Sequence, residues 1–221
     1  MTPEVPDDVS AADLAAYCLM LGDDALVLSH RLAQWCSRAP DLEEDVALAN
    51  LALDLLGQAR VLLARAAEVD PAVVPELPAG SPAPPEDRLA YFRSAQEFCN
   101  LRLVELENGD FAETVARVLL MATMRLAVLD RLAASTDEVL AAVAASGRRE
   151  LAYHRDWAAR WVRTLALGTE ESHRRLHTGL ERLWPWYAEA WRPHETERRL
   201  AAVGVGVDPA TVAPEVGAVL D

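Results

Sequence analysis

Apolar residues recur at every third or fourth position through four long stretches of this 221-residue chain. A side chain that can accept hydrogen bonds at a helix N-terminus precedes each stretch, namely Ser10, Asp41, Asp110 and Ser135. This spacing places the apolar side chains of each stretch on one helix face. The sequence therefore predicts four long helices, ending near residues 37, 69, 134 and 168. The second is apolar almost all round between Val46 and Leu56, so we expect it to be the most buried helix.

The segments between and after the long helices indicate how they are connected. Residues 70–86 are rich in proline and glycine, and we expect a short amphipathic helix over residues 86–100. A fifth helix begins at Thr169, and Pro185 should stop or kink it. Two hairpins joined by one long crossover predict an all-α fold, a ferritin-like antiparallel four-helix bundle with extra C-terminal helices. We interpret residues 1–221 as a single ferritin-like domain.

Composition and charge exclude several classes of protein. Alanine and leucine dominate, and only 10 residues are glycine, which favours helices. A formal net charge of −14 disfavours binding to nucleic acid, whose phosphates are negative. The first residues lack the profile of a signal peptide, and apolar runs such as residues 118–129 are too short to cross a bilayer. We therefore expect a cytoplasmic protein that binds no nucleic acid and no membrane, with three reduced, buried cysteines, Cys18, Cys36 and Cys99.

A ferritin-like bundle raises the question of a metal site. Di-iron bundles of this kind use a Glu from each of two helices and a Glu-x-x-His from each of the other two. The register of the first hairpin places Asp54 and Gln58 near the middle of the bundle. Glu150 and His154 lie on the inward face of the fourth long helix, and we expect them to face residues 116–120. Both pairs are spaced i,i+4 rather than i,i+3.

These four residues are better explained as a degenerate site. Glutamine is a weak neutral ligand, and residues 115–122 of the third long helix contain no carboxylate. A dinuclear centre would therefore lack a bridging ligand. Because buried polar groups need partners, we expect Glu150 and His154 to bond to Asp54 or Gln58 across the core.

Other candidate motifs have simpler explanations. Glu170 and His173 form a literal Glu-x-x-His, followed by His177, but a capping Glu beside surface histidines explains the pattern. His30, next to Ser29, has no acid at a suitable spacing. One group of arginines is expected to form a solvated face, or alternatively to receive a carboxylate or phosphate: Arg148, Arg149, Arg155, Arg160 and Arg163. A group of tryptophans is assigned to the core or to an interface with another chain: Trp157, Trp161, Trp184, Trp186 and Trp191.

Four stretches of the sequence carry a family resemblance. They read LGDDALVLSHRLAQW at residues 21–35, ANLALDLLGQAR at 49–60, NLRLVELENGDFAETVAR at 100–117 and ELAYHRDW at 150–157. In this order they resemble the C-subunit family of the bacterial phenylacetyl-CoA epoxidases, also called phenylacetate-CoA oxygenases. The resemblance extends over roughly residues 12–210.

The resemblance implies a ferritin-like fold and a non-catalytic, structural role in aerobic phenylacetate degradation. In that family the C subunit pairs with a homologous A subunit, which carries the di-iron centre and epoxidises the aromatic ring of phenylacetyl-CoA. A reductase subunit supplies electrons from NADPH. The C subunit has lost metal ligands, so Asp54, Gln58, Glu150 and His154 match its polar core positions. We therefore expect no cofactor, metal or catalytic residue in this chain.

The sequence leaves two other functions open. The chain is a metal-dependent ferritin-like oxygenase in its own right if Glu150 and His154 help to bind two metals. It is a binding module for the CoA moiety or the reductase if the arginine faces around Arg148 and Arg149 make those contacts. The structural subunit is the leading hypothesis.

Overall fold

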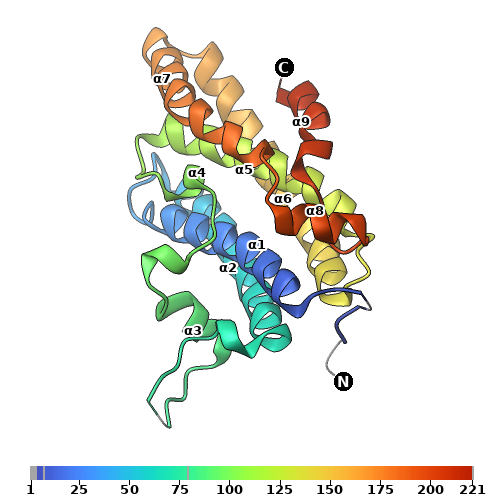
Figure 1. Ribbon diagram of the computed structural model, residues 1–221. Helices are drawn as coiled ribbons and strands as arrows, with labels where there is room; N and C mark the ends of the chain where they lie inside the picture. The colour runs from blue at the N-terminus through green and yellow to red at the C-terminus, as the bar shows by residue number, and fades with distance from the viewer. Residues whose placement is uncertain (1–3, 7, 79, 221) are drawn as a thin grey trace.

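The computed structural model describes residues 4–6, 8–78 and 80–220 (Figure 1). Over these residues the chain is all-helical and contains no strand. The α-helices of this part are α1 (Ala11–Ala33), α2 (Leu42–Val69), α3 (Pro85–Tyr91), α4 (Arg102–Glu105), α5 (Phe111–Leu132), α6 (Glu138–Leu167), α7 (Glu170–Tyr187), α8 (Glu195–Ala202) and α9 (Ala213–Leu220). Helices α1, α2, α5 and α6 are the longest, and they are the four long helices that the apolar spacing predicted.

Side-chain caps decide where these long helices begin. Ser10, Asp41 and Asp110 accept hydrogen bonds from backbone N–H groups in the first turns of α1, α2 and α5, as predicted. The cap of α6 is Asp137 rather than the predicted Ser135, because the Asp137 carboxylate accepts from an N–H of the first turn at 2.9 Å. Ser135 instead donates its hydroxyl to a backbone carbonyl just after α8 at 2.7 Å. This bond ties the second hairpin to the C-terminal tail.

Two connecting segments differ from the prediction. The helix expected over residues 86–100 is only α3, because Ser94 and Glu97 form a capping box that starts a separate 3-10 turn. The single turn of α4 was not predicted. Pro185 lies inside α7, which ends two residues further, at Tyr187. Because the proline lies in the last turn, the one backbone hydrogen bond that it removes is close to the end of the helix.

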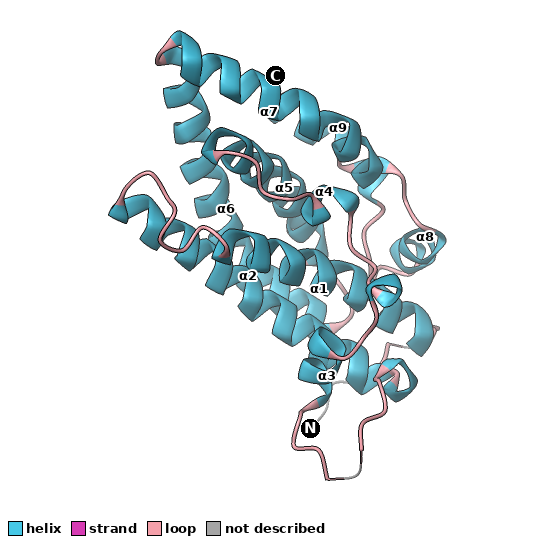
Figure 2. Cartoon of the chain, turned by 90° about the vertical axis from the view of Figure 1, so that its left-hand side faces the viewer, coloured by secondary structure: helices cyan, strands magenta, loops and turns pink. Residues whose placement is uncertain are grey.

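The long helices pack as two antiparallel hairpins, α1 with α2 and α5 with α6 (Figures 1 and 2). In the first hairpin the Ser29 hydroxyl donates to the carbonyl of Ala52 at 2.8 Å. Further toward the start of α1, the Cα of Gly22 lies so close to α2 that an added Cβ would stand 3.2 Å from Leu63. The second hairpin joins the first through α2 and α6 and through a bond of 3.0 Å from the Trp35 indole N–H to Thr114.

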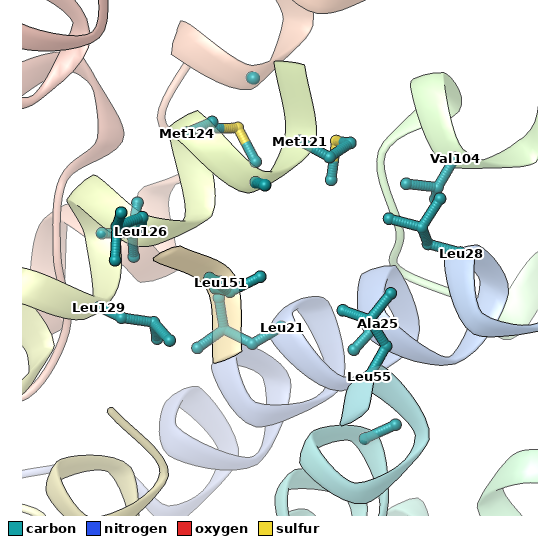
Figure 3. Close-up of a cluster of buried hydrophobic side chains, with 14 of the residues drawn as sticks. Leu21, Ala25, Leu28, Leu55, Val104, Met121, Met124, Leu126, Leu129 and Leu151 are labelled. Atoms are coloured by element: carbon teal, nitrogen blue, oxygen red, sulfur yellow. The ribbon is translucent and has the colours of Figure 1, made fainter. Parts of the chain in front are cut away.

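The apolar core lies between the two hairpins. Figure 3 shows side chains of α1, α2, α5 and α6 directed toward one another, with Val104 of α4 at one edge. Those labelled are Leu21, Ala25, Leu28, Leu55, Val104, Met121, Met124, Leu126, Leu129 and Leu151. In both views the crossover with α3 and the C-terminal α7 lie at opposite ends of the molecule (Figures 1 and 2).

The prediction that the second long helix is the most buried one is wrong. In α5, 18 of 22 residues are buried, whereas in α2 only 11 of 28 are. Helix α5 is covered by α6, by α7 and by the first hairpin. Helix α2 is covered on its inward side, and large apolar side chains such as Leu53 remain exposed on the other. An all-apolar stretch therefore does not by itself imply burial on all sides.

By length and composition alone, one of the described helices, α2, is long and apolar enough to cross a membrane. The core helix of a water-soluble protein passes the same test, and α2 carries the buried Arg65, whose guanidinium bonds to Asp137 at 2.6 Å.

The burial of the cysteines is only partly as expected, since Cys18 is buried but Cys36 and Cys99 are exposed.

Candidate functional site

The four polar residues singled out from the sequence meet in the structure, between α2 and α6. Asp54 and Gln58 stand one turn apart on α2, and Glu150 and His154 stand one turn apart on α6. Because the two helices run antiparallel, His154 meets Asp54 with Nε2 to Oδ2 at 3.0 Å, and Gln58 Nε2 donates to Glu150 Oε2 at 2.7 Å. The expected hydrogen bonds between the two pairs are present, but they lie at the edge of the core rather than across it, because the Asp54 side chain is 36% exposed and Glu150 is half-buried.

His154 is held as a neutral ring within this group. Its side chain is 2% exposed, and burial lowers its pKa, while the hydrogen bond to Asp54 and the charge of Glu150 oppose the shift. The ring nitrogen that faces the Asp54 carboxylate is Nε2, so we assign the proton of the neutral ring to Nε2. His154 therefore acts as a hydrogen-bond donor rather than as a free base.

This environment predicts a pH dependence of stability. The folded pKa of His154 lies below its unfolded value of about 6.5, so the unfolded chain takes up the proton first as the pH falls. The contribution of His154 is present above pH 6.5 and is lost as the pH falls toward the folded pKa. Urea unfolding at pH 7 and pH 5 measures this loss. The His154→Gln variant should lose less stability between these two pH values, and equal losses in both proteins would contradict the assignment.

The partner residues on α5 lie about one turn further along than expected. Residues 116–120 are predicted to lie opposite Glu150 and His154. A cavity of about 20 Å³ beside His154 is lined from α5 by Val118, which falls in that range, and by Met121, Ala122 and Arg125, which lie beyond it. Part of the shift arises from the direction of the side chains. Helical side chains lean toward the N-terminus of their own helix, so each of two residues that touch across an antiparallel pair lies C-terminal to the point of contact.

Arg125 also belongs to this core, although it was not predicted as a site residue. Its Nη2 donates to Oδ2 of Asp24 at 2.6 Å, and both side chains are about nine-tenths buried. Burial raises the pKa of Asp24 to about 6, against the opposing effect of the Arg125 charge. An arginine within the apolar run of α5 was the available signal, because a charge on a buried helix face needs a partner.

Asp23 and Asp24 anchor the crossover onto α1. The Asp24 carboxylate accepts a hydrogen bond from the N–H of Leu101 at 2.7 Å. Asp23 is fully buried and accepts two bonds from the Arg93 guanidinium, at 2.5 and 3.0 Å, and one from the N–H of Cys99 at 2.9 Å. The signal in the sequence was the pair of adjacent acids on an apolar helix face, which demands partners from elsewhere in the chain.

These donors do not fit a dinuclear metal centre. The carboxylates of this group already have protein partners: Asp24 has Arg125, Asp54 has His154, and Glu150 has Gln58. A buried guanidinium beside the cavity would also repel a cation. Among residues 4–6, 8–78 and 80–220, no group of three or more His, Cys, Asp or Glu side chains is arranged to hold a metal ion.

The remaining sequence candidates lie apart from this core. Glu170, His173 and His177 are exposed on α7, and His177 contacts Glu181 at 3.5 Å. His30 is exposed, while Ser29 is used in the bond between α1 and α2 described above.

The tryptophans and arginines divide between structural contacts and solvent. Trp157 and Trp161 pack edge-on against Phe111 at centroid distances of 6.3 and 5.0 Å, whereas Trp184 and Trp186 are exposed. The arginines of α6 lie toward solvent, where some of them pair with Asp130 or Asp156.

The sequence matches one described family and one characterised relative. The profile of a family described as phenylacetic acid catabolic protein matches residues 2–219. A protein of Escherichia coli (strain K12), named as the C subunit of 1,2-phenylacetyl-CoA epoxidase, is 42% identical over 199 residues. The aligned region covers 90% of this chain and 76% of that relative.

Proposed function

The chain belongs to the phenylacetic acid catabolic protein family, and we propose that it is the C subunit of a 1,2-phenylacetyl-CoA epoxidase. Its role is structural: it holds the catalytic A subunit in an active, soluble complex that functions in aerobic phenylacetate degradation. The support comes from the family match over nearly the whole chain and from the name of the relative. No catalytic residue, cofactor or metal is assigned to this chain.

We infer that the two hairpins form a ferritin-like four-helix bundle. Such bundles join two helix pairs by one long crossover. Here residues 70–110 run from the end of α2 to the start of α5, and α2 contacts α6 while α1 bonds to α5. The short helices α8 and α9 are additions after the bundle.

One observation carries the non-catalytic role, namely the internal pairing of the polar core. Residues that would be ligands in a di-iron bundle are bonded to each other, and Arg125 brings a positive charge to the same cavity. A buried polar group that already has a partner gains little by binding a metal, because it must first lose that bond. The core is therefore suited to hold the bundle together rather than to activate oxygen.

The proposed complex contains further components. The di-iron centre belongs to the homologous A subunit, where it supplies the oxygen chemistry, and the other epoxidase subunits include a reductase. The location of the complex is cytoplasmic.

Reconstitution tests the proposed function. In the presence of the reductase subunit, NADPH and oxygen, the catalytic A subunit of the same organism is expected to be inactive or unstable in epoxidising phenylacetyl-CoA without this chain, and adding this chain should restore activity. The chain purified alone from medium containing iron and manganese should hold well below one metal equivalent. Full activity of the A subunit alone contradicts the structural role. About two equivalents of metal, lost in a Glu150→Ala variant, would make the chain an oxygenase in its own right.

A further inference from the structure

The core cavity beside His154 receives one polar side chain from each of the four long helices. Asp24 comes from α1 and Gln58 from α2, while Arg125 comes from α5 and His154 from α6. We call these four residues the core quartet. Each is more than nine-tenths buried, with an exposed fraction between 1% and 8%. Polar groups at this depth are rarely left without hydrogen-bond partners.

The rest of the cavity wall is apolar and limits the size of what can enter. Figure 3 shows several of these wall residues, Ala25, Leu55, Met121 and Leu151 among them, directed toward one another from the four helices. The volume of about 20 Å³ exceeds the roughly 10–15 Å³ that one water molecule requires. The cavity is therefore the size of a single water molecule.

The core quartet has hydrogen-bonding capacity beyond the bonds made in the described part of the chain. Arg125 uses Nη2 in its bond to Asp24, and the guanidinium carries further N–H groups on Nε and Nη1. His154 uses Nε2, so with the proton on that nitrogen Nδ1 is an acceptor. Gln58 donates through Nε2 to Glu150, which leaves its Oε1 as an acceptor. Donors and acceptors are thus both present around one small space.

Neighbouring groups hold the core quartet in place. The Asp24 carboxylate that pairs with Arg125 also accepts the N–H of Leu101 at 2.7 Å. At Gly147 of α6 an added Cβ would stand 3.3 Å from the side-chain amide of Gln58, so this amide lies directly against the α6 backbone. A ligand that binds between groups already fixed in position requires little reorganisation of the protein.

The charges of the core quartet select a neutral ligand. The positive charge of Arg125 repels a cation, and the negative charge of Asp24 beside it repels an anion. Gln58 is uncharged, and the buried His154 ring is neutral. Polar cavities of this size retain water, whereas purely apolar ones stay dry.

We propose that this cavity binds one water molecule, which accepts a hydrogen bond from Arg125 and donates to Nδ1 of His154 and Oε1 of Gln58. The water connects the Asp24–Arg125 pair with the two pairs between α2 and α6, so that one polar network runs through all four long helices. The site belongs to this chain alone and goes beyond the proposed function.

The solution test counts long-lived internal water molecules in the full chain by oxygen-17 magnetic relaxation dispersion. Ala122→Val and Ala25→Val each add two carbon atoms to the cavity wall, from α5 and from α1, and each should remove one water from the count. Ala127→Val is the matched control, because Ala127 is a buried alanine of α5 outside the lining of this cavity, and its count should equal the wild type. Thermal unfolding confirms that each variant is folded, and either cavity variant is sufficient if the other fails to fold.

A high-resolution crystal structure of the wild-type chain provides the second test. We expect one density peak within hydrogen-bond distance of Arg125 and His154, and no such peak in Ala122→Val. A wild-type cavity without a peak, or equal water counts in wild type and both cavity variants, overturns the proposal. Replacement of the peak by bromide in soaked crystals would make the ligand an anion. These results leave the proposed function standing, whereas the anomalous signal of a transition metal would contradict both the water site and the non-catalytic role.

Discussion

The Asp24→Asn variant is expected to lose about 3–5 kcal/mol of unfolding free energy, because it leaves the guanidinium of Arg125 charged and unpaired in the core. Asparagine keeps an oxygen that can accept the N–H of Leu101, so the lost ion pair dominates the effect. Urea unfolding at pH 8 measures the change, because the pKa of Asp24 is about 6 and the carboxylate is ionised at that pH.

The double variant Asp24→Asn/Arg125→Met separates the ion pair from its surroundings. Removing both charges together should return the stability to within about 1 kcal/mol of the wild type, since buried ion pairs often contribute little compared with apolar residues of similar volume. A double-mutant cycle then gives the interaction free energy of the pair. If Asp24→Asn alone is as stable as the wild type, the pair is dispensable and this account of the core is wrong.

The Asp23→Ala variant is expected to show a loss of similar size, about 3–5 kcal/mol, and to release the crossover. Asp23 accepts two hydrogen bonds from the guanidinium of Arg93, whose side chain is 3% exposed and lies over the Phe98 ring at 4.2 Å. It also accepts the N–H of Cys99. Limited trypsin digestion should therefore cut the variant after Arg88 or Arg93 under conditions in which the wild type is intact.

Asp13→Ala is the matched control for this experiment. Asp13 is also an acid on α1 in an arginine pair, with Arg199 at 2.6 Å, but the Arg199 side chain is 55% exposed. Solvent screens such pairs, so the loss should stay below about 1 kcal/mol. Equal losses in Asp13→Ala and Asp23→Ala would show that burial of the Asp23 pair adds nothing.

Local signals in the sequence were sufficient to predict the four long helices, but not the short α4. The caps at Ser10, Asp41 and Asp110 act within one turn of chain, so the first helical turn alone determines them. The cap of α6 was misassigned because Ser135 and Asp137 are both good caps, and the C-terminal tail takes the Ser135 hydroxyl. The boundary of α6 therefore depends on a contact from 70 residues further along the chain.

The polar core was predictable in part. The i,i+4 spacing of Asp54 with Gln58 and of Glu150 with His154 put each pair on one helix face, and the packing of α2 against α6 brings the two pairs together. The position of Arg125 was not predicted, because a shift of one helical turn between α5 and α6 decides which residue meets the cavity. That shift depends on side-chain direction and helix packing, which the spacing of residues does not contain.

The sequence by itself determined the helical class, the four long helices and the family, because these depend on periodicity, capping and local motifs. Only the tertiary structure decided that Asp23 and Asp24 hold the crossover and that α5 rather than α2 is enclosed. An apolar residue has the same local preference whether its face meets the core or a partner. The exposure of Leu53 is therefore a property of how the helices are placed around α2, and not of the residues within it.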